Sequence, residues 1–296
     1  MSSAVHSIDK KAINRRQRKD NFFRGLVFTF ALITISPIVL IIYKLVVKGY
    51  KQINLSFFTE TAPDTYEAMV AIGNNETIPG GILNGITGTL LMVILASLIA
   101  IPIGVLIGIY LYEKGDKWYA NLVRNTTDIL QGVPSIVLGL IAYFWVVKPI
   151  TNGFSALAGS VALAIMMFPL IIRSTEETLK MIPDSIKEAG FALGVPYHKI
   201  ILRVLVPTGL SGLLTGILLA ISRIIGETAP LMLTALGSMQ VNTDITQPTS
   251  AIPLLIWEFY NDPNMVDLIW SSSLILMIFV LGLNLLSKYI AAKRNL

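Results

Sequence analysis

The sequence has no cysteine, only two histidines and few charged residues. Without cysteine, the chain forms no disulfide and has no thiol catalyst or cysteine-ligated metal. His6 and His198 lie far apart in polar segments, which argues against a zinc or iron site. The chain also lacks a Gly-x-x-x-x-Gly-Lys-Ser/Thr loop, so it has no Walker motif for ATP and is not expected to be an enzyme by itself. We therefore expect this chain to bind no cofactor, and energy for active transport would have to come from a partner or an ion gradient.

Charged residues make up only 14% of the chain and apolar residues 54%, whereas a typical soluble domain has about 25% charged residues. The apolar residues fall in long runs separated by short polar segments, which is the pattern of membrane proteins. Each run has at least about 17 residues, enough to cross roughly 30 Å of hydrocarbon as a helix. The predicted spans are residues 24–47, 83–112, 129–147, 156–173, 208–234 and 267–290. The fold class predicted is therefore an all-α membrane protein with about six transmembrane helices.

These spans suggest a division of the chain into four parts. A basic tail, 1–23, precedes an N-terminal transmembrane helix with its long outer loop, 24–82. A five-span core, 83–290, follows and contains a central polar loop at 174–207. A short tail, 291–296, ends the chain.

Lysine and arginine are distributed unequally between the two sides of the predicted membrane. The two tails, the loops at 113–128 and 174–207, and the span ends that adjoin them hold 18 of them, the other side holds 4, and Arg223 lies inside a span. Because cytoplasmic loops carry an excess of Lys and Arg, both termini and the central loop are expected in the cytoplasm, with the chain crossing the membrane several times. We interpret the excess of basic over acidic residues as an indication of how the chain is oriented in the membrane. We therefore expect contact with membrane lipid but not with nucleic acid.

Arg223 and Glu227 lie inside the predicted fifth span. A charge at the bilayer centre costs on the order of 2.5–3.5 kcal/mol, so such residues pair, face a bundle interior or line a pathway. Two interpretations stay open: the pair neutralises itself and serves packing only, or Arg223 meets an anion while Glu227 orients it. A guanidinium offers a planar donor fork suited to oxyanions, and Thr228 adds a hydroxyl donor.

Small residues accompany this pair along the span. In a continuous helix, six positions fall within an arc of about 80° at 100° per residue: Gly212, Gly216, Ala220, Arg223, Glu227 and Pro230. The stripe of Gly212, Gly216 and Ala220 would let another helix approach closely. Arg173 ends the fourth span; it is a secondary candidate for the pathway, although a snorkelling arginine at the interface is the preferred interpretation.

The central loop has clear helix boundary signals. Pro183 predicts the start of a short helix, Gly194 a hinge after it, and Pro196 the start of a second short helix. Ile186, Gly190 and Leu193 would share one face of the first helix, with Lys187 pointing away. A face of small residues suits docking into the cleft of another protein; the alternative is an amphipathic loop that lies on the membrane.

The same loop resembles the EAA loop of binding-protein-dependent ABC importer permeases. The resemblance rests on Glu188-Ala189-Gly190, on Gly194 and on the ending Val204-Leu205-Val206-Pro207. Gly190 stands where the family usually has alanine, and valines 204 and 206 stand where isoleucine and leucine are usual. The resemblance implies that Glu188, Ala189, Gly190, Gly194 and Pro207 contact an ATP-hydrolysing subunit.

Further segments are similar to the PstA-type permeases of phosphate-specific ABC importers. They are Gly80-Gly81-Ile82, Gly88-Thr89-Leu90, Val133-Pro134-Ser135-Ile136-Val137, Gly139-Leu140, Arg173-Ser174-Thr175-Glu176, Gly190-Phe191-Ala192-Leu193-Gly194, and Arg223 followed by Gly226-Glu227-Thr228-Ala229-Pro230-Leu231. The resemblance implies the type I ABC importer permease fold and translocation of inorganic phosphate delivered by an external binding protein. It also implies a heterodimer with a PstC-like permease, two PstB-like ATPases that hold ATP and Mg, and a PstS-like phosphate-binding protein.

Other functions remain open on the sequence alone. A permease of the same fold could carry another oxyanion, such as a phosphonate, sulfate or molybdate. An ion-coupled transporter or channel would need intramembrane carboxylates or histidines, and the spans offer only Glu227. A membrane scaffold that reports phosphate status to a sensor kinase is compatible with transport.

Overall fold

The computed structural model describes residues 10–294, which are almost entirely helical and contain no strand beyond one isolated bridge between Leu236 and Thr249. The chain divides into two compact units, residues 1–48 and 49–296. Four helices are long and apolar enough to cross a membrane, and two bent helix pairs bring the number to as many as six. The expected all-α membrane fold is confirmed.

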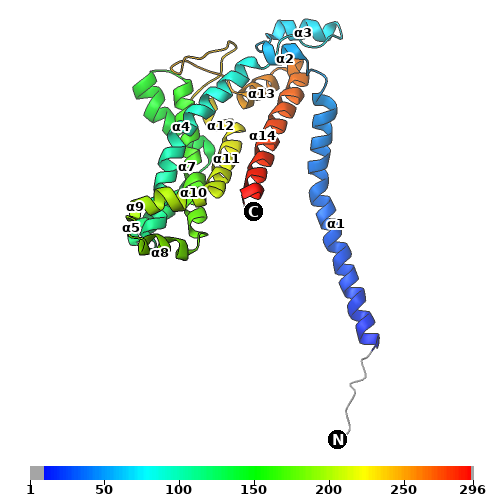
Figure 1. Ribbon diagram of the computed structural model, residues 1–296. Helices are drawn as coiled ribbons and strands as arrows, with labels where there is room; N and C mark the ends of the chain where they lie inside the picture. The colour runs from blue at the N-terminus through cyan, green and yellow to red at the C-terminus, as the bar shows by residue number, and fades with distance from the viewer. Residues whose placement is uncertain (1–9, 295–296) are drawn as a thin grey trace. The chain divides into compact units, whose positions relative to one another are not determined.

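Helix α1 (Lys10–Gly49) forms the first unit, drawn in blue in Figure 1. None of the side chains in its most apolar window is buried. Pro37 lies inside the helix and cannot donate a hydrogen bond to the carbonyl of Ile33. The hydroxyl of Ser36 donates to that carbonyl at 3.2 Å, so the acceptor is satisfied and the helix continues through the proline.

The second unit is built around α7 (Ala156–Lys180), which packs against α4 (Leu83–Lys114) and α11 (Leu210–Ile225). Small residues allow the close approach to α4: a Cβ on Gly104 would lie 2.8 Å from the Ile171 side chain. Helix α14 (Val266–Arg294) packs on the other side of α11 and on α13 (Ile252–Tyr260). Figure 1 shows these helices in the cyan-to-red part of the chain. The main apolar core contains Met92, Ala96 and Ala100 of α4, Leu163, Met167 and Ile171 of α7, and Ala220 and Ile224 of α11.

The predicted span 129–147 is broken in the structure, and the predicted loop 113–128 before it is largely helical. Helix α5 (Trp118–Gly132) already occupies most of that loop, and α6 (Ser135–Ala142) begins after a sharp bend and continues as π-helix η1 (Tyr143–Thr151). The two parts are bent by 107°. Pro134 precedes α6 and disfavours a helical conformation at Val133, which ends α5 at this point.

The predicted span 208–234 is also interrupted. Helix α11 ends at Ile225, Gly226 follows, and a short helix α12 (Ala229–Met232) begins after Thr228 with Pro230 in its first turn. Glu227 and Pro230 therefore do not continue the face that carries Gly212, Gly216 and Ala220, and the expected six-residue arc is wrong beyond Arg223. Gly226 and Pro230 lower the free-energy cost of interrupting the helix here.

Segments outside the predicted spans form a layer of short helices. Helices α2 (Leu55–Thr59), α3 (Thr65–Gly73) and α13, with the 3-10 turn η3 (Pro263–Met265), enclose a second apolar cluster around Phe57, Ile82 and Phe259. Helix α13 lies in the segment 237–266, between the last two predicted spans. Asn84 joins the layer to α4, since its amide contacts the Ala62 N–H at 3.3 Å and the Ser238 carbonyl at 2.7 Å.

Candidate functional site

A small cavity of about 140 Å³ lies where four helices meet beside Arg223. The bend after α5 and the break after α11 place polar groups on its walls. Its lining comprises Leu130, Gln131 and Val133 near the bend, Ser135 and Leu138 of α6, Met166 and Pro169 of α7, Arg223 of α11, and Glu227. The structure therefore brings Arg223 and Glu227 to one cavity, and it adds Gln131 and Ser135, which sequence reasoning did not select.

Arg223 is not neutralised by a partner within the chain. Its side chain is exposed, and the guanidinium makes no ion pair or hydrogen bond with any residue that the structure describes. Glu227 is half-buried and interacts with the positive charge of Arg223 without a direct bridge. The Ser135 side chain lines the same cavity and interacts electrostatically with the Glu227 carboxylate. The donor fork of Arg223 is thus available to an anion at the cavity mouth.

The small-residue stripe of α11 packs against α7 of the same chain. A Cβ on Gly212 would lie 2.5 Å from Thr178, and one on Gly216 would lie 1.6 Å from the Ser174 hydroxyl oxygen. Ala220 is fully buried in the main core. Arg223 lies beside this packed face rather than within it, because the face is occupied by α7 while Arg223 remains exposed.

Thr228 precedes the short helix α12 and sets its start. Its carbonyl accepts hydrogen bonds from the N–H groups of Leu231 and Met232, each at 3.1 Å. Helix α6 holds this segment in place, since a Cβ on Gly139 would lie 2.6 Å from Pro230 Cα. The position of Glu227 therefore depends on a glycine that touches neither charge.

We expect Gly139→Ala to impair transport although it removes no polar group. The added methyl group would push α12 away from α6, at an overpacking cost of about 1–3 kcal/mol, and would shift Glu227 from Ser135. Gly132→Ala is the matched control, since nothing lies within 4 Å of a Cβ there. The check is the rate of substrate uptake at equal amounts of assembled protein. Equal rates for Gly139→Ala and the native chain would show that the α6–α12 contact does not position the cavity.

The central loop folds as predicted into two short helices around a glycine. Helix α8 (Asp184–Ala192) follows Pro183, Gly194 has the left-handed φ of +69°, and α9 (Tyr197–Ile200) follows Pro196. Another π-helical turn, η2 (Ile201–Leu205), and α10 (Val206–Thr208), which contains Pro207, then lead to α11. The pair from Tyr197 to Thr208 and from Leu210 to Ile225 is bent by 69°.

Two expectations about the faces of α8 are wrong. Lys187 does not point away: its ammonium lies over the rings of Tyr112 and Tyr197, at 5.8 and 5.6 Å from their centroids. Gly190 faces the loop's own interior, where a Cβ would lie 3.0 Å from Ile200. The sequence period could not show which side of α8 the second helix covers.

The outer surface of α8 is instead made of exposed residues, several of them apolar. Glu188 and Ala189 are exposed, Phe191 is 48% exposed and stacks on Tyr197, and Leu193 is 83% exposed. A leucine exposed to this degree on a polar loop is typical of a contact surface.

A charged cluster between α5 and α7 was missed at the sequence level. The carboxylate Oε1 of Glu176 contacts Arg124 at 2.7 Å and Lys180 at 2.8 Å. Arg124 also donates to the Leu111 carbonyl at 3.1 Å, and Glu176 is only 1% exposed. Arg124 and Lys180 were counted only as topology charges, and no local pattern connects residues 124 and 176.

Arg173 belongs to the same cluster. Its guanidinium forms a bidentate pair with Asp128 of α5 and lies 3.7 Å from Glu176. This side chain thus turns to a carboxylate on a neighbouring helix, and its interpretation as a snorkelling arginine stays a prediction. Arg173 does not line the cavity of Arg223.

Comparison with known proteins places this architecture in a family. The profile described as "Binding-protein-dependent transport system inner membrane component" matches residues 100–293. Two solved structures share the fold. The MetNI methionine ABC transporter in an inward-facing conformation has a TM-score of 0.59 at 22% identity, covering 71% of this chain and 94% of that chain. A bacterial ABC transporter involved in import of the acidic polysaccharide alginate has a TM-score of 0.58 at 13% identity, covering 94% and 99%.

Curated relatives extend over nearly the whole chain. The phosphate transport system permease protein PstA of Yersinia pestis is 38% identical and covers 99% of this chain and 97% of its own length. The protein of the same name from Mycobacterium leprae is 34% identical, with 95% and 92% covered. The chain is thus a multi-pass inner-membrane protein with the type I ABC importer permease fold, and it belongs to the PstA family of binding-protein-dependent transport permeases.

Proposed function

We propose that this chain is the permease subunit of an ATP-driven importer and passes inorganic phosphate across the inner membrane. The observation that carries the proposal is the exposed guanidinium of Arg223, which has no ion-pair or hydrogen-bond partner among the described residues and lies beside a polar cavity. Arginine keeps its charge in every accessible pH range and matches the oxygen geometry of phosphate. The name shared by the relatives, phosphate transport system permease protein, supports the same substrate.

The importer also needs subunits that this chain does not supply. A PstC-like permease would complete the pathway, two PstB-like subunits would bind ATP and Mg and hydrolyse the nucleotide, and a PstS-like protein would deliver phosphate from outside. In this arrangement Glu188, Ala189, Phe191 and Leu193 form the exposed surface that contacts an ATPase. Gly190, Gly194 and Pro207 shape the loop that presents it.

Uptake into proteoliposomes tests the substrate. The chain would be reconstituted with the three candidate partners, with ATP enclosed on the side of the ATPase. We expect accumulation of radioactive phosphate that stops without ATP and is not inhibited by excess sulfate or molybdate. Transport of either oxyanion in preference to phosphate would favour the same-fold alternative. Uptake that needs an ion gradient but no ATPase would favour a secondary transporter.

The coupling role of the central loop predicts an uncoupled variant. Gly194→Asp adds a bulky, charged side chain next to the exposed face of α8 and strains a left-handed backbone position by about 1 kcal/mol. We expect ATP hydrolysis to persist while phosphate uptake falls at least tenfold, because a loss of about 1.4 kcal/mol in the coupled step already gives that factor.

Gly115→Asp is a matched control for that variant. Gly115 also has a positive φ, +57°, and open space around a Cβ, but it follows α4 rather than α8. It should keep uptake coupled to hydrolysis. Equal loss of coupling in both variants would show that backbone strain, and not docking at α8, is responsible.

The proposed orientation places both termini and the segment 174–207 in the cytoplasm. Single cysteines report it cleanly, because the chain has none of its own. In intact cells an impermeant thiol reagent should label Tyr66→Cys of α3 and should not label Glu188→Cys until the membrane is opened. Both native side chains are exposed. Labelling of position 188 from outside would reverse the orientation.

A further inference from the structure

The N-terminal segment 10–24 carries a charge that the proposed transport function does not use. Residues 1–24 hold seven of the chain's 23 Lys and Arg residues and two of its 18 Asp and Glu residues, and they therefore carry a net charge of +5. The whole chain has the same net charge of +5, so residues 25–296 are neutral in sum. The excess positive charge of this protein thus lies at one end of α1.

The basic side chains of this segment that the structure describes have no partner among the described residues. Arg124, Arg173 and Lys180 of the second unit each pair with a carboxylate. By contrast, four basic side chains of α1 are exposed and make no ion pair or hydrogen bond with any described residue: Arg16, Arg18, Lys19 and Arg24. Their charge is available to a ligand outside the chain.

The helix orders part of this charge along one side. Positions 11, 15, 18 and 19 of α1 follow the spacing i, i+4, i+7 and i+8, which falls within an arc of about 100°. Lys11, Arg15, Arg18 and Lys19 occupy these positions, and Phe22 continues the same arc. We call these four residues the basic face.

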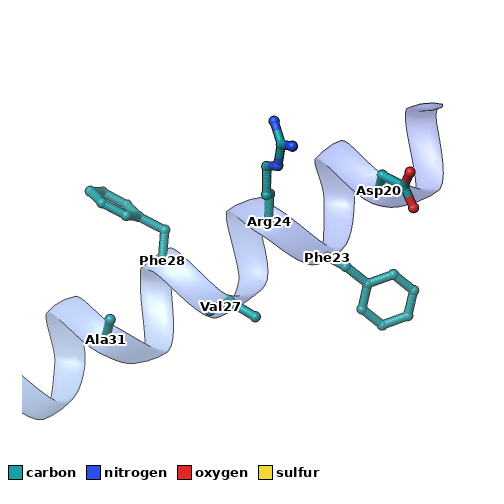
Figure 2. Close-up of a pocket in the computed structure, with 6 residues that line it drawn as sticks. All are labelled: Asp20, Phe23, Arg24, Val27, Phe28 and Ala31. Carbon is teal, nitrogen blue, oxygen red and sulfur yellow. The ribbon is translucent and has the colours of Figure 1, made fainter.

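The basic face adjoins the membrane without a linker. Figure 2 shows that the charged and the apolar residues lie on one helix: Asp20 and Arg24 are followed by Val27, Phe28 and Ala31. These side chains project to different sides of the helix. In the apolar part of α1 that follows, no side chain of the most apolar stretch is buried. The segment from residue 16 to 24 spans about 12 Å of helix, which is close to the Debye length of about 8–10 Å at physiological salt. Anionic headgroups at the bilayer surface are therefore within electrostatic range of the basic face.

We propose that the basic segment 10–24 binds the anionic phospholipid headgroups of the leaflet in which α1 begins. This contact fixes the depth and rotation of α1 in the bilayer, and the side chains from 16 to 44 are exposed along the helix. A lipid surface fits better than a compact anion, because the charges are spread along four helical turns, and the open pocket beside Arg24 is lined otherwise by Asp20 and four apolar side chains. The proposal does not depend on phosphate as substrate or on the side of the membrane.

A spin label on the native helix tests the proposal without altering its charge. Gln17→Cys provides the single cysteine, since Gln17 is exposed and lies outside the arc of the basic face. The full-length chain would be placed in nanodiscs of phosphatidylcholine with increasing phosphatidylglycerol. We expect the label to become less mobile as phosphatidylglycerol increases and to regain mobility at high salt. Mobility that does not depend on the anionic lipid would overturn the proposal.

Two charge variants separate electrostatics from other causes. Replacing all four residues of the basic face by glutamine should remove most of the lipid response, since each charge near the surface contributes roughly fivefold in affinity. The exchange Lys11→Arg, Arg15→Lys, Arg18→Lys and Lys19→Arg preserves charge and should keep the response. An unchanged response in the glutamine variant, or a lost response in the exchange variant, would overturn the proposal. The proposal would also be overturned if the spin label became immobile only after an ATPase subunit or nucleic acid was added, whatever the lipid composition.

Discussion

Arg223→Gln should reduce phosphate uptake at least 100-fold while the subunit still folds and assembles. The guanidinium offers two charge-assisted hydrogen bonds to an oxyanion, each contributing roughly 1.5–3 kcal/mol, and glutamine supplies neither the charge nor the fork. Stability should change by less than about 0.5 kcal/mol, because the exposed native side chain has no partner in the chain that the structure describes. Uptake in proteoliposomes, ATP hydrolysis without substrate, and the amount of assembled complex together measure this separation.

Two further variants decide between a pathway role and a packing role for Arg223. Arg223→Lys keeps the charge but not the planar fork, so uptake should remain poor. The double change Arg223→Gln with Glu227→Gln removes both charges. If the pair served only to neutralise itself, the double variant would recover uptake. Such recovery would contradict the pathway role, and the absence of a direct Arg223–Glu227 ion pair argues against it.

How much of this fold the sequence predicts depends on how many neighbouring residues each sequence pattern covers. Hydropathy finds the spans because a membrane helix needs an uninterrupted apolar run, and α4, α7 and α14 lie close to their predicted bounds. The same signal passes over the bend at Val133 and the break at Gly226, since apolar residues continue across both. Arg223 and Glu227 line the same cavity in the structure. They do so because the helix ends between them, and not because they are one turn apart on an unbroken helix.

Contacts between segments that are distant in the chain could not be predicted from the sequence. Gln131 and Ser135 join the cavity because α5 and α6 are bent by 107°, and no local pattern specifies that angle. Glycine, proline and proline-flanked turns did predict the two helices of the central loop, since those signals act over a few residues. Which face of α8 is covered depends on Ile200, on the next helix, and so appeared only in the folded chain.

Glu176→Gln should be the most destabilising single polar substitution in the core. It leaves Arg124 with 8% exposure and without its carboxylate, and breaking one partner of a buried pair typically costs 3–5 kcal/mol. We expect the apparent melting temperature of the purified chain to fall on the order of 10 °C. Glu177→Gln is the matched control, since this neighbouring carboxylate is exposed, and its melting temperature should stay within about 2 °C of the native value.

A double substitution tests whether the loss comes from the uncompensated charge. Arg124→Met with Glu176→Leu replaces the buried pair by apolar side chains, which is often neutral or stabilising when both charges are removed. Lys180 and Arg173 have 51% and 29% of their side chains exposed, so each can turn to water when Glu176 is lost. The double variant should therefore recover most of the melting temperature lost in Glu176→Gln. If it is as unstable as the single variant, the hydrogen bonds of Arg124 to Leu111 of α4 and to Asn121 of α5, which only the double variant loses, would contribute to stability in addition to the ion pair.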